Sequence, residues 1–227
     1  PGARWFPDAK LNFAENLLRR NDDSVALVFW GEDKVKREVT HAELYAQTSR
    51  IAAALRAAGI KAGDRVAGYL PNVPEAIAAM LAASSIGAIW SSCSPGFGGQ
   101  GVLDRFGQIE PVVLFAADGY WYNGKALDSL AKTRDIVECL PSVRRVVIVP
   151  YIGDRAQAGS VPGAQSLEDF VPVTAAGRIR FEQLAFNHPL YILYSSGTTG
   201  VPKCIVHGAG GTLLQHMKEH QLHSDVK

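Results

Sequence analysis

The 227-residue sequence predicts an α/β fold built from parallel βαβ units. Two patterns predict this fold. From residue 65 onward, short runs of apolar and β-branched residues alternate with longer segments whose apolar residues recur at helical spacing. The interiors of the short runs are mostly apolar, as expected for strands of a parallel sheet covered by helices. A chain of this length is also long enough to bury a substantial core.

Three elements are expected before the alternation begins. The first is a helix over residues 8–19 with Asp8 as its N-cap, because its leucines fall on one helical face. The second is a β-hairpin whose strands lie within residues 24–40 on either side of a Gly-Glu-Asp turn. The third is a helix that opens with a capping box at Thr40 and continues to residue 58, where a glycine follows.

The alternating part of the chain predicts four strands and three helices. The strands are expected at residues 65–70, 88–91, 112–116 and 145–149. The helices are expected at residues 74–87, 100–109 and 127–140. Because strands joined through a helix normally run in the same direction, these strands should form one parallel sheet.

Residues 153–177 have a different composition, in which Gly, Pro, Ala and Ser dominate and apolar periodicity is lost. We expect this segment to be a surface excursion. It separates a first α/β subdomain over residues 1–152 from a final segment over residues 178–227. The final segment should contain two strands and a helix, at residues 191–194, 204–206 and 210–220.

Charge and cysteine content exclude several classes of protein. With 23 basic against 22 acidic residues the net charge is +1, which predicts no nucleic-acid or anionic-membrane partner and favours small-molecule substrates. Three scattered cysteines fit neither a disulfide framework nor a structural zinc site, so we expect a cytoplasmic protein. The most apolar stretch, residues 76–90, is shorter than the roughly 20 residues that span a bilayer. Oligomeric state is not predicted.

The segment that carries chemistry is YSSGTTGVPK, residues 194–203. Glycines allow a ligand to approach the backbone, while peptide N–H groups and hydroxyls supply neutral donors for an anion. The lysine adds a charge-assisted contact, about twice as strong as a neutral hydrogen bond. The residues predicted to bind a polyphosphate are Ser195, Ser196, Gly197, Thr198, Thr199, Gly200 and Lys203.

The segment is not a Walker P-loop. In that motif the lysine directly follows the second glycine and leads into a helix, whereas here Val201 and Pro202 intervene and a strand follows. A kinase or GTPase of the P-loop class is therefore disfavoured. The alternative interpretation of this segment is a Ser/Thr/Gly-rich turn between two strands that binds no ligand.

YSSGTTGVPK resembles the phosphate-binding signature of the adenylate-forming superfamily, which includes acyl-CoA synthetases, luciferases and the adenylation domains of peptide synthetases. Further segments resemble the short-chain acyl-CoA synthetases, and most specifically their acetoacetate-activating branch. These segments are residues 5–18, 63–98, 103–111, 115–125 and 205–216. The resemblance therefore covers nearly the whole chain.

The resemblance implies an acid–thiol ligase that forms an acyl-adenylate from a carboxylate and ATP and then transfers the acyl group to coenzyme A. By the same resemblance, Thr198, Thr199 and Gly200 contact the β- and γ-phosphates, and Lys203 adds positive charge there. Thr198 and Lys203 are therefore the candidate catalytic residues. Magnesium is expected as the counter-ion of ATP, with no metal site of the protein's own.

The resemblance places the nucleotide end of coenzyme A near residues 97–99 and 120–125. The candidate contacts are Phe97, Gly98 and Lys125, the last at a position where related acetyl-CoA synthetases carry a basic residue. A solvated loop lysine is an equally good interpretation of Lys125. The aromatic run 120–122 fits either stacking on an adenine or packing over a domain seam.

The chain begins at Pro1 without an initiator Met and ends at Lys227 in an expected helix and loop, so we expect a fragment. It would be the N-terminal part of the large AMP-binding domain, with the acyl pocket, the adenine site and a C-terminal lid domain outside it. The isolated chain is then expected to be inactive. Two alternatives remain: a synthetase for another short-chain acid, such as acetate or propionate, and a non-catalytic nucleotide-binding module.

Overall fold

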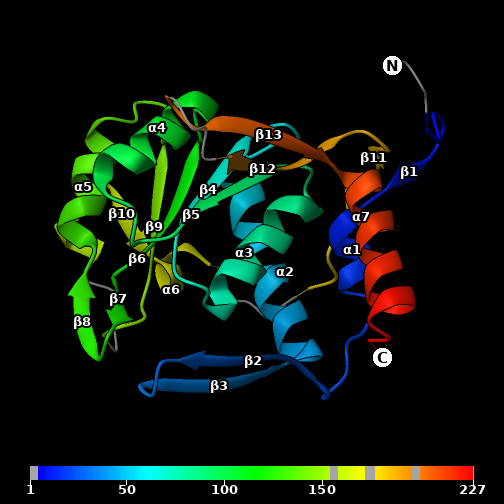
Figure 1. Ribbon diagram of the computed structural model, residues 1–227, viewed down its shortest axis with the longest axis horizontal. Coiled ribbons are helices and arrows are strands. Elements are labelled where there is room, and N and C mark those ends of the chain that lie inside the picture. Colours follow the sequence, from blue (N-terminus) through cyan, green and yellow to red (C-terminus); the bar gives the residue numbers. More distant parts are fainter. Residues whose placement is uncertain (1–4, 154–157, 172–176, 196–199, 227) are drawn as a thin grey trace.

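The computed structural model describes residues 5–153, 158–171, 177–195 and 200–226. Its centre is a seven-stranded sheet with the strand order β10-β9-β6-β4-β5-β12-β13 (Figure 1). All neighbouring strands run parallel except β12 and β13, which are antiparallel. The strands are β4 Arg65–Tyr69, β5 Ile89–Cys93, β6 Val113–Ala117, β9 Arg145–Val149, β10 Ala164–Ser166, β12 Pro189–Ser195 and β13 Lys203–Gly208. The predicted α/β class is confirmed.

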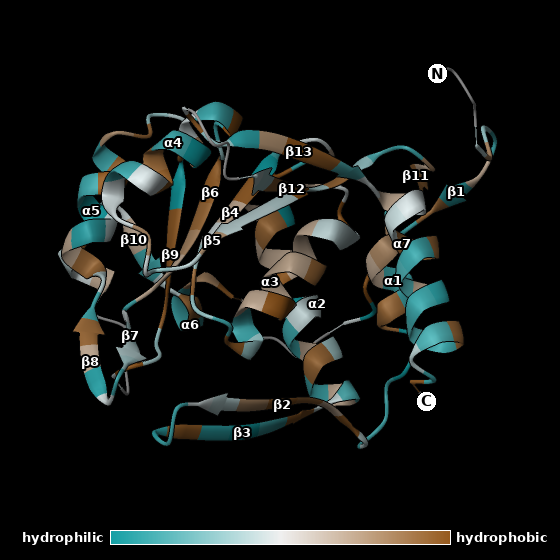
Figure 2. Ribbon diagram, in the orientation of Figure 1, coloured by the Kyte–Doolittle hydropathy of each residue, from teal (hydrophilic) through white to brown (hydrophobic). Residues whose placement is uncertain are grey.

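Helices cover both faces of this sheet, as Figure 1 shows. Helices α2 (His41–Ala57) and α3 (Pro74–Ser85) pack with one set of buried strand residues, which includes Val66 and Phe115. Helices α4 (Gly99–Ile109) and α5 (Leu130–Glu138) pack with the other set, which includes Ala67 and Leu114. Successive residues of a strand point to opposite faces, so the mostly apolar strands contribute side chains to both cores. In Figure 2 these strands are largely brown between helices that carry teal outer faces.

Local signals set the limits of α2 as expected. The backbone N–H of Glu43 donates to Oγ1 of Thr40 over 3.1 Å, and Oε2 of Glu43 accepts from the Thr40 N–H over 2.8 Å. This capping box satisfies two of the donors that a helix start leaves free. Gly59 follows the helix with φ +79, a left-handed conformation that glycine adopts without a steric cost.

The start of the chain differs from the prediction. Helix α1 spans only Phe13–Leu17, and its N-cap is Asn12 rather than Asp8. Residues Lys10–Leu11 instead form β1, which pairs antiparallel with β11, Leu184–Ala185. The buried Asn12 amide donates to the carbonyls of Ser84, Ser85 and Glu182, so contacts distant in sequence determine where this helix begins.

Two further segments differ from the prediction. The helix expected from residue 127 begins at Leu130, because a hairpin of β7 (Gly119–Tyr122) and β8 (Lys125–Asp128) precedes it. The Asn123-Gly124 turn of this hairpin has positive φ at both residues (50 and 74), which is typical of tight hairpins. The expected excursion at residues 153–177 is also partly folded into the domain. There β10 extends the sheet beside β9, Val161 is buried, and the short helix α6 (Leu167–Phe170) packs on the strands.

The remaining elements lie around this core. Strands β2 (Val25–Gly31) and β3 (Val35–Thr40) form the expected hairpin, which lies apart from the main sheet below α2 in Figure 1. Helix α7 (Ala209–Lys218) follows β13, lies beside α1 and continues into a π-helical turn, Glu219–His223. Within the described ranges, none of the helices combines the length and apolar character needed to span a bilayer.

Candidate active site

The carboxyl ends of the parallel strands meet at one edge of the sheet, where open α/β sheets bind their ligands. Strand β12 reaches this edge at Ser195, and β13 leaves it at Lys203. Of the seven predicted phosphate-binding residues, Ser195, Gly200 and Lys203 lie in the part of the chain that the structure describes. Ser196, Gly197, Thr198 and Thr199 lie outside the described residues.

Ser195 and Lys203 are paired directly across the β12–β13 hairpin. Residues paired in this way have side chains on the same face of a sheet, so a hydroxyl and an amine are presented together. Lys203 is exposed, and no carboxylate of the described chain forms an ion pair with it. Its charge is therefore available to an anion.

The connection between the two strands supports a ligand-binding turn over a plain one. The strands do form an antiparallel hairpin, as either interpretation requires, but the connection is residues 196–202, longer than the two to five residues of ordinary hairpin loops. Gly200 has φ +103, a conformation that strains any residue with a Cβ. This matches the role expected of glycine in the motif.

The strand that enters the turn is anchored from the neighbouring strand. The buried hydroxyl of Ser91 on β5 shares its hydrogen between the Ile192 carbonyl at 2.9 Å and the Tyr194 hydroxyl at 3.0 Å. Burial raises the pKa of Tyr194 well above its usual range, so the phenol stays neutral. An apolar cavity of about 280 Å³, lined in part by Tyr191 and Leu193, lies on the face that Ser195 shares.

Of the two segments expected to meet coenzyme A, only residues 120–122 line a cavity, and they do so together with the residues just before Phe97. This cavity, of about 390 Å³, is lined by Pro95 and Gly96 after β5 and by residues 120–122 of β7. Phe97, Gly98 and Lys125 do not line it directly. Phe97 is 40% exposed one residue beyond its wall, and Lys125 is exposed on β8 opposite the lining residue Tyr122.

The backbone of residues 95–97 is held by hydrogen bonds from a buried tyrosine. The hydroxyl of the fully buried Tyr69 on β4 lies 3.0 Å from the Pro95 carbonyl and 3.2 Å from the Phe97 carbonyl, and donates to them. Burial raises the pKa of Tyr69 to about 12, so this donor keeps its proton at physiological pH. Gly98 then serves as the N-cap of α4.

Most lining residues of this cavity were missed in the sequence, among them two polar ones. Asn72 follows β4 and Tyr151 follows β9, and both line the cavity. Their position just after strands expected to be parallel was the available signal. The buried carboxylate of Asp118 holds the Tyr151 turn by accepting hydrogen bonds from the backbone N–H groups of residues 151, 152 and 153, at 2.8, 3.1 and 3.1 Å.

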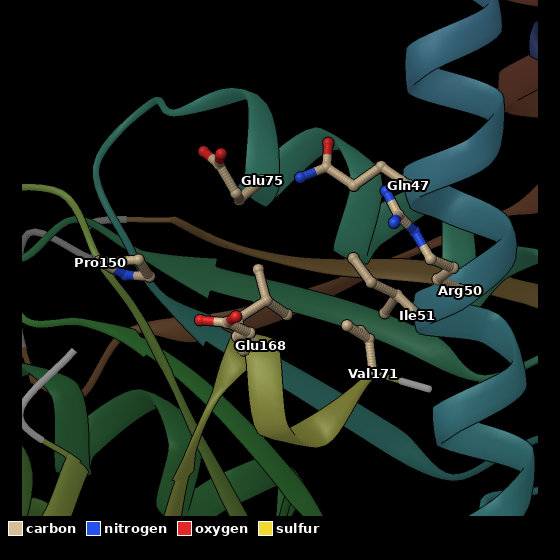
Figure 3. A pocket seen from close by; sticks show the side chains of 8 residues that line it. Gln47, Arg50, Ile51, Glu75, Pro150, Glu168 and Val171 are labelled. Atoms are coloured by element: carbon tan, nitrogen blue, oxygen red, sulfur yellow. The ribbon is translucent and has the colours of Figure 1, made fainter. Parts of the chain in front are cut away.

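A further cavity, of about 230 Å³, lies between α2, the start of α3 and α6 (Figure 3). Glu75, Glu168, Gln47 and Arg50 surround it together with apolar side chains. Both Glu75 oxygens already accept hydrogen bonds of 2.8 Å from Arg37. None of the predicted site residues lines this cavity, so we assign it no part in the site.

The histidines of the final segment show no sign of a metal site. Over the described residues, no group of three or more His, Cys, Asp or Glu side chains could hold a metal ion. His216 and His220 have ring centroids 6.1 Å apart, and His216 also packs on Phe13. His207 packs on Tyr191 with ring centroids 5.2 Å apart.

A parallel α/β sheet with a hydroxyl- and glycine-rich turn and an unpaired lysine at its carboxyl edge has the features of a nucleotide-binding domain. Comparison with known proteins gives the family. The model of the AMP-binding enzyme family matches residues 13–226, and the chain belongs to this family.

Among members of this family, the chain is similar to several acyl-CoA synthetases. The chain is 60% identical to acetoacetyl-coenzyme A synthetase of Rhizobium meliloti (strain 1021) and 50% identical to acetoacetyl-CoA synthetase of Danio rerio, over 99% and 98% of its length. It is 42% identical to a malonamoyl-CoA synthetase of Penicillium aethiopicum, over 100% of its length. The solved acetoacetyl-CoA synthetase from Streptomyces lividans matches all of the chain with a TM-score of 0.92 at 46% identity. The chain spans about a third (33–34%) of the length of each of these proteins.

Proposed function

We propose that the protein carrying this chain is an ATP-dependent acyl-CoA ligase that activates acetoacetate as its adenylate and transfers the acyl group to coenzyme A. The proposal is supported by 60% identity to an acetoacetyl-coenzyme A synthetase across almost the whole chain. It is also supported by the position of the turn at the ligand-binding edge of the sheet, with Ser195 and Lys203 side by side.

The turn would grip the triphosphate of ATP. A carboxylate is a poor electrophile, and activation requires that pyrophosphate leave as the carboxylate oxygen attacks the α-phosphorus. Hydroxyl and backbone donors of residues 195–200 would orient the phosphates, with Thr198 placed against the leaving pyrophosphate. Lys203 would neutralise the charge that grows there, and preorganised groups of this kind commonly supply the largest part of catalysis.

Magnesium would accompany ATP as its counter-ion. The described residues supply no cluster of carboxylates for it, so its contacts would be the phosphates themselves and groups elsewhere. A hydroxyl of the turn is a donor type that fits such an ion.

Coenzyme A would lie against the cavity lined by Pro95, Gly96 and residues 120–122, with Phe97, Gly98 and Lys125 near these lining residues. Phe97 offers an exposed ring for an adenine, Gly98 allows close approach at the start of a helix, and Lys125 offers a charge for a phosphate. The support for this assignment is that residues 120–122 and the two residues before Phe97 line one cavity. The thiol would then attack the acyl carbon and release AMP.

Acetoacetate is proposed over its competitors on the relatives alone, because we place the acyl pocket, the adenine site and a C-terminal lid domain outside residues 1–227. Malonamate is the nearest competitor, since it has an amide where acetoacetate has a methyl ketone and a relative named for it shares 42% identity. Acetate and propionate are the more distant ones. We further propose a cytoplasmic protein, with the subdomains over residues 1–152 and 178–227 joined by residues 153–177.

The test is acid-dependent pyrophosphate release by the complete protein that carries this chain. We expect turnover with acetoacetate, less with malonamate, and much less with acetate or propionate. Pyrophosphate release with acetate but not with acetoacetate would show that acetate is the substrate. ATP binding without release in the presence of any acid would favour a non-catalytic nucleotide-binding module. The 227-residue chain alone should release no pyrophosphate.

A further inference from the structure

The helix α4 contacts both arms of the phosphate-binding turn. On the entering arm, the guanidinium carbon of Arg105 lies 5.7 Å from the ring centroid of Tyr194. On the leaving arm, the side-chain amide of Gln108 donates to the Pro202 carbonyl over 2.8 Å, and its oxygen faces the Cys204 thiol at 3.6 Å. Arg105 and Gln108 are three positions apart, so they share one face of the helix.

The same arginine also contacts the segment assigned to coenzyme A. Its guanidinium carbon lies 4.3 Å from the ring centroid of Phe97, and its Nη1 donates to the Gly101 carbonyl over 2.6 Å. The guanidinium is therefore close to two aromatic rings that belong to different segments of the site. A cation held against aromatic faces is stabilised, most when it is shielded from water.

Arg105 has no acidic partner that would explain its place. No carboxylate of the described residues lies within ion-pair distance of it. It is also half-buried. A half-buried cation without a carboxylate needs another source of stabilisation, which here comes from the two rings and one carbonyl.

Arg105 contacts the turn from the sheet face opposite the side chains of Ser195 and Lys203. Tyr194 and Cys204 are paired in register next to Ser195 and Lys203, so the two pairs point to opposite faces of the sheet. Tyr194 and Cys204 pack in the core cluster of α4. Arg105 therefore lies on the face opposite the side chains of Ser195 and Lys203, which are the ones that would meet the phosphates.

We propose that Arg105, with Gln108, is a positioning residue that holds the two arms of the turn in the spacing that ATP requires and ties them to the Phe97 segment. This inference rests on the proposed phosphate role of Ser195, Gly200 and Lys203. A planar guanidinium can stack on two rings at once, which an ammonium group cannot do. Charge alone should therefore not replace it.

The test uses the complete protein and its Arg105→Met, Arg105→Lys and Gln108→Ala variants. Magnesium-ATP affinity is measured by calorimetry, together with KM and kcat for ATP and KM for the acid. We expect ATP to bind about tenfold more weakly to Arg105→Met and about threefold more weakly to Arg105→Lys and Gln108→Ala. KM for ATP should rise in step, while KM for the acid stays unchanged. The matched control is Arg134→Met on α5, an exposed arginine that pairs with Asp135.

The readouts separate this inference from a structural role and from the proposed function. Variants with a lowered melting temperature but unchanged ATP affinity would overturn the inference, and so would full rescue by lysine. If Arg105→Met does not fold, the comparison depends on Arg105→Lys and Gln108→Ala alone. Wild-type affinity for magnesium-ATP in both of these variants would overturn the inference. Wild-type protein that binds ATP without acid-dependent pyrophosphate release refutes the ligase assignment but still permits this comparison. Wild-type protein that does not bind ATP refutes both.

Discussion

One carboxylate oxygen of Glu32, at the tip of the β2–β3 hairpin, accepts a hydrogen bond of 2.8 Å from the backbone nitrogen of Gly124, at the tip of β7–β8. The other oxygen accepts from the Asn123 nitrogen, also at 2.8 Å. Two hairpins that lie about 90 residues apart in sequence are thus joined by a single side chain. Nearby, the amine of Lys34 lies 5.7 Å from the Trp121 ring centroid, so the first hairpin supports one wall of the coenzyme cavity.

Glu32→Gln in the complete protein should weaken coenzyme A use. The amide retains one acceptor oxygen, so one of the two N–H bonds in the turn is lost and Lys125 on the same hairpin becomes less well placed. We expect KM for coenzyme A to rise about threefold to tenfold while KM for ATP is unchanged, as follows from the loss of one charge-assisted bond at an exposed site. Asp33→Asn removes the same charge from the same turn and should have no effect. Equal changes in both variants would contradict this role for Glu32.

Asp118→Asn should destabilise the fold. The buried carboxylate accepts three backbone N–H groups, and an asparagine has one acceptor oxygen for the same donors. At least one buried donor then loses its partner, which costs about 1 to 3 kcal/mol of unfolding free energy. Urea denaturation of the 227-residue chain measures the loss. Asp135→Asn, an exposed aspartate on α5, is the control and should change stability by less than about 0.5 kcal/mol.

Two glycines should respond in opposite directions to alanine. A Cβ on Gly68 in β4 would lie 2.7 Å from the Trp90 ring, so Gly68→Ala forces a core side chain to move and should cost about 1 to 3 kcal/mol. A Cβ on Gly107 in α4 meets nothing within 4 Å, so Gly107→Ala should gain about 0.5 to 1 kcal/mol from helix propensity. Urea denaturation compares both with the wild type. An unchanged free energy of unfolding in Gly68→Ala would show that the Trp90 ring does not pack tightly against β4.

Stability should fall at high pH through Cys93. Burial raises the pKa of this thiol from 9.0 to about 11, so the folded chain keeps the proton after the unfolded chain has lost it. The stabilisation is complete below pH 9 and declines between pH 9 and 11, at up to about 1.4 kcal/mol per pH unit. Cys93→Ala removes this dependence. The wild type should therefore be more stable than the variant by an amount that shrinks by about 1 kcal/mol between pH 8 and pH 10. A constant difference would contradict the raised pKa.

Most of the fold follows from local patterns, and its departures have physical causes. The capping box of Thr40 and the apolar strands could be predicted because their signals lie within a few residues. Helix α1 could not, because Asn12 finds its partners at Ser84, Ser85 and Glu182, far along the chain. The Asn123-Gly124 dipeptide is a hairpin signal, so the β7–β8 hairpin could have been predicted from it.

The same distinction holds for the candidate site. The turn that ends at Lys203 is a continuous motif, so its chemistry could be predicted before its position was known. The supporting residues are scattered. Nothing in the spacing of Arg105 or Asp118 indicates that one contacts the rings of Phe97 and Tyr194 and the other holds the turn after β9. Such residues become apparent only when the strand order is known.

The central claim is that residues 195–203 hold the phosphates of ATP, and it is tested most directly by changing Thr198, Thr199 and Lys203 together to alanine in the complete protein. Calorimetry with magnesium-ATP measures the effect on binding. We expect affinity to fall at least about a hundredfold, since a charge-assisted contact and two hydroxyl donors are lost. ATP binding equal to that of the wild type would contradict the claim.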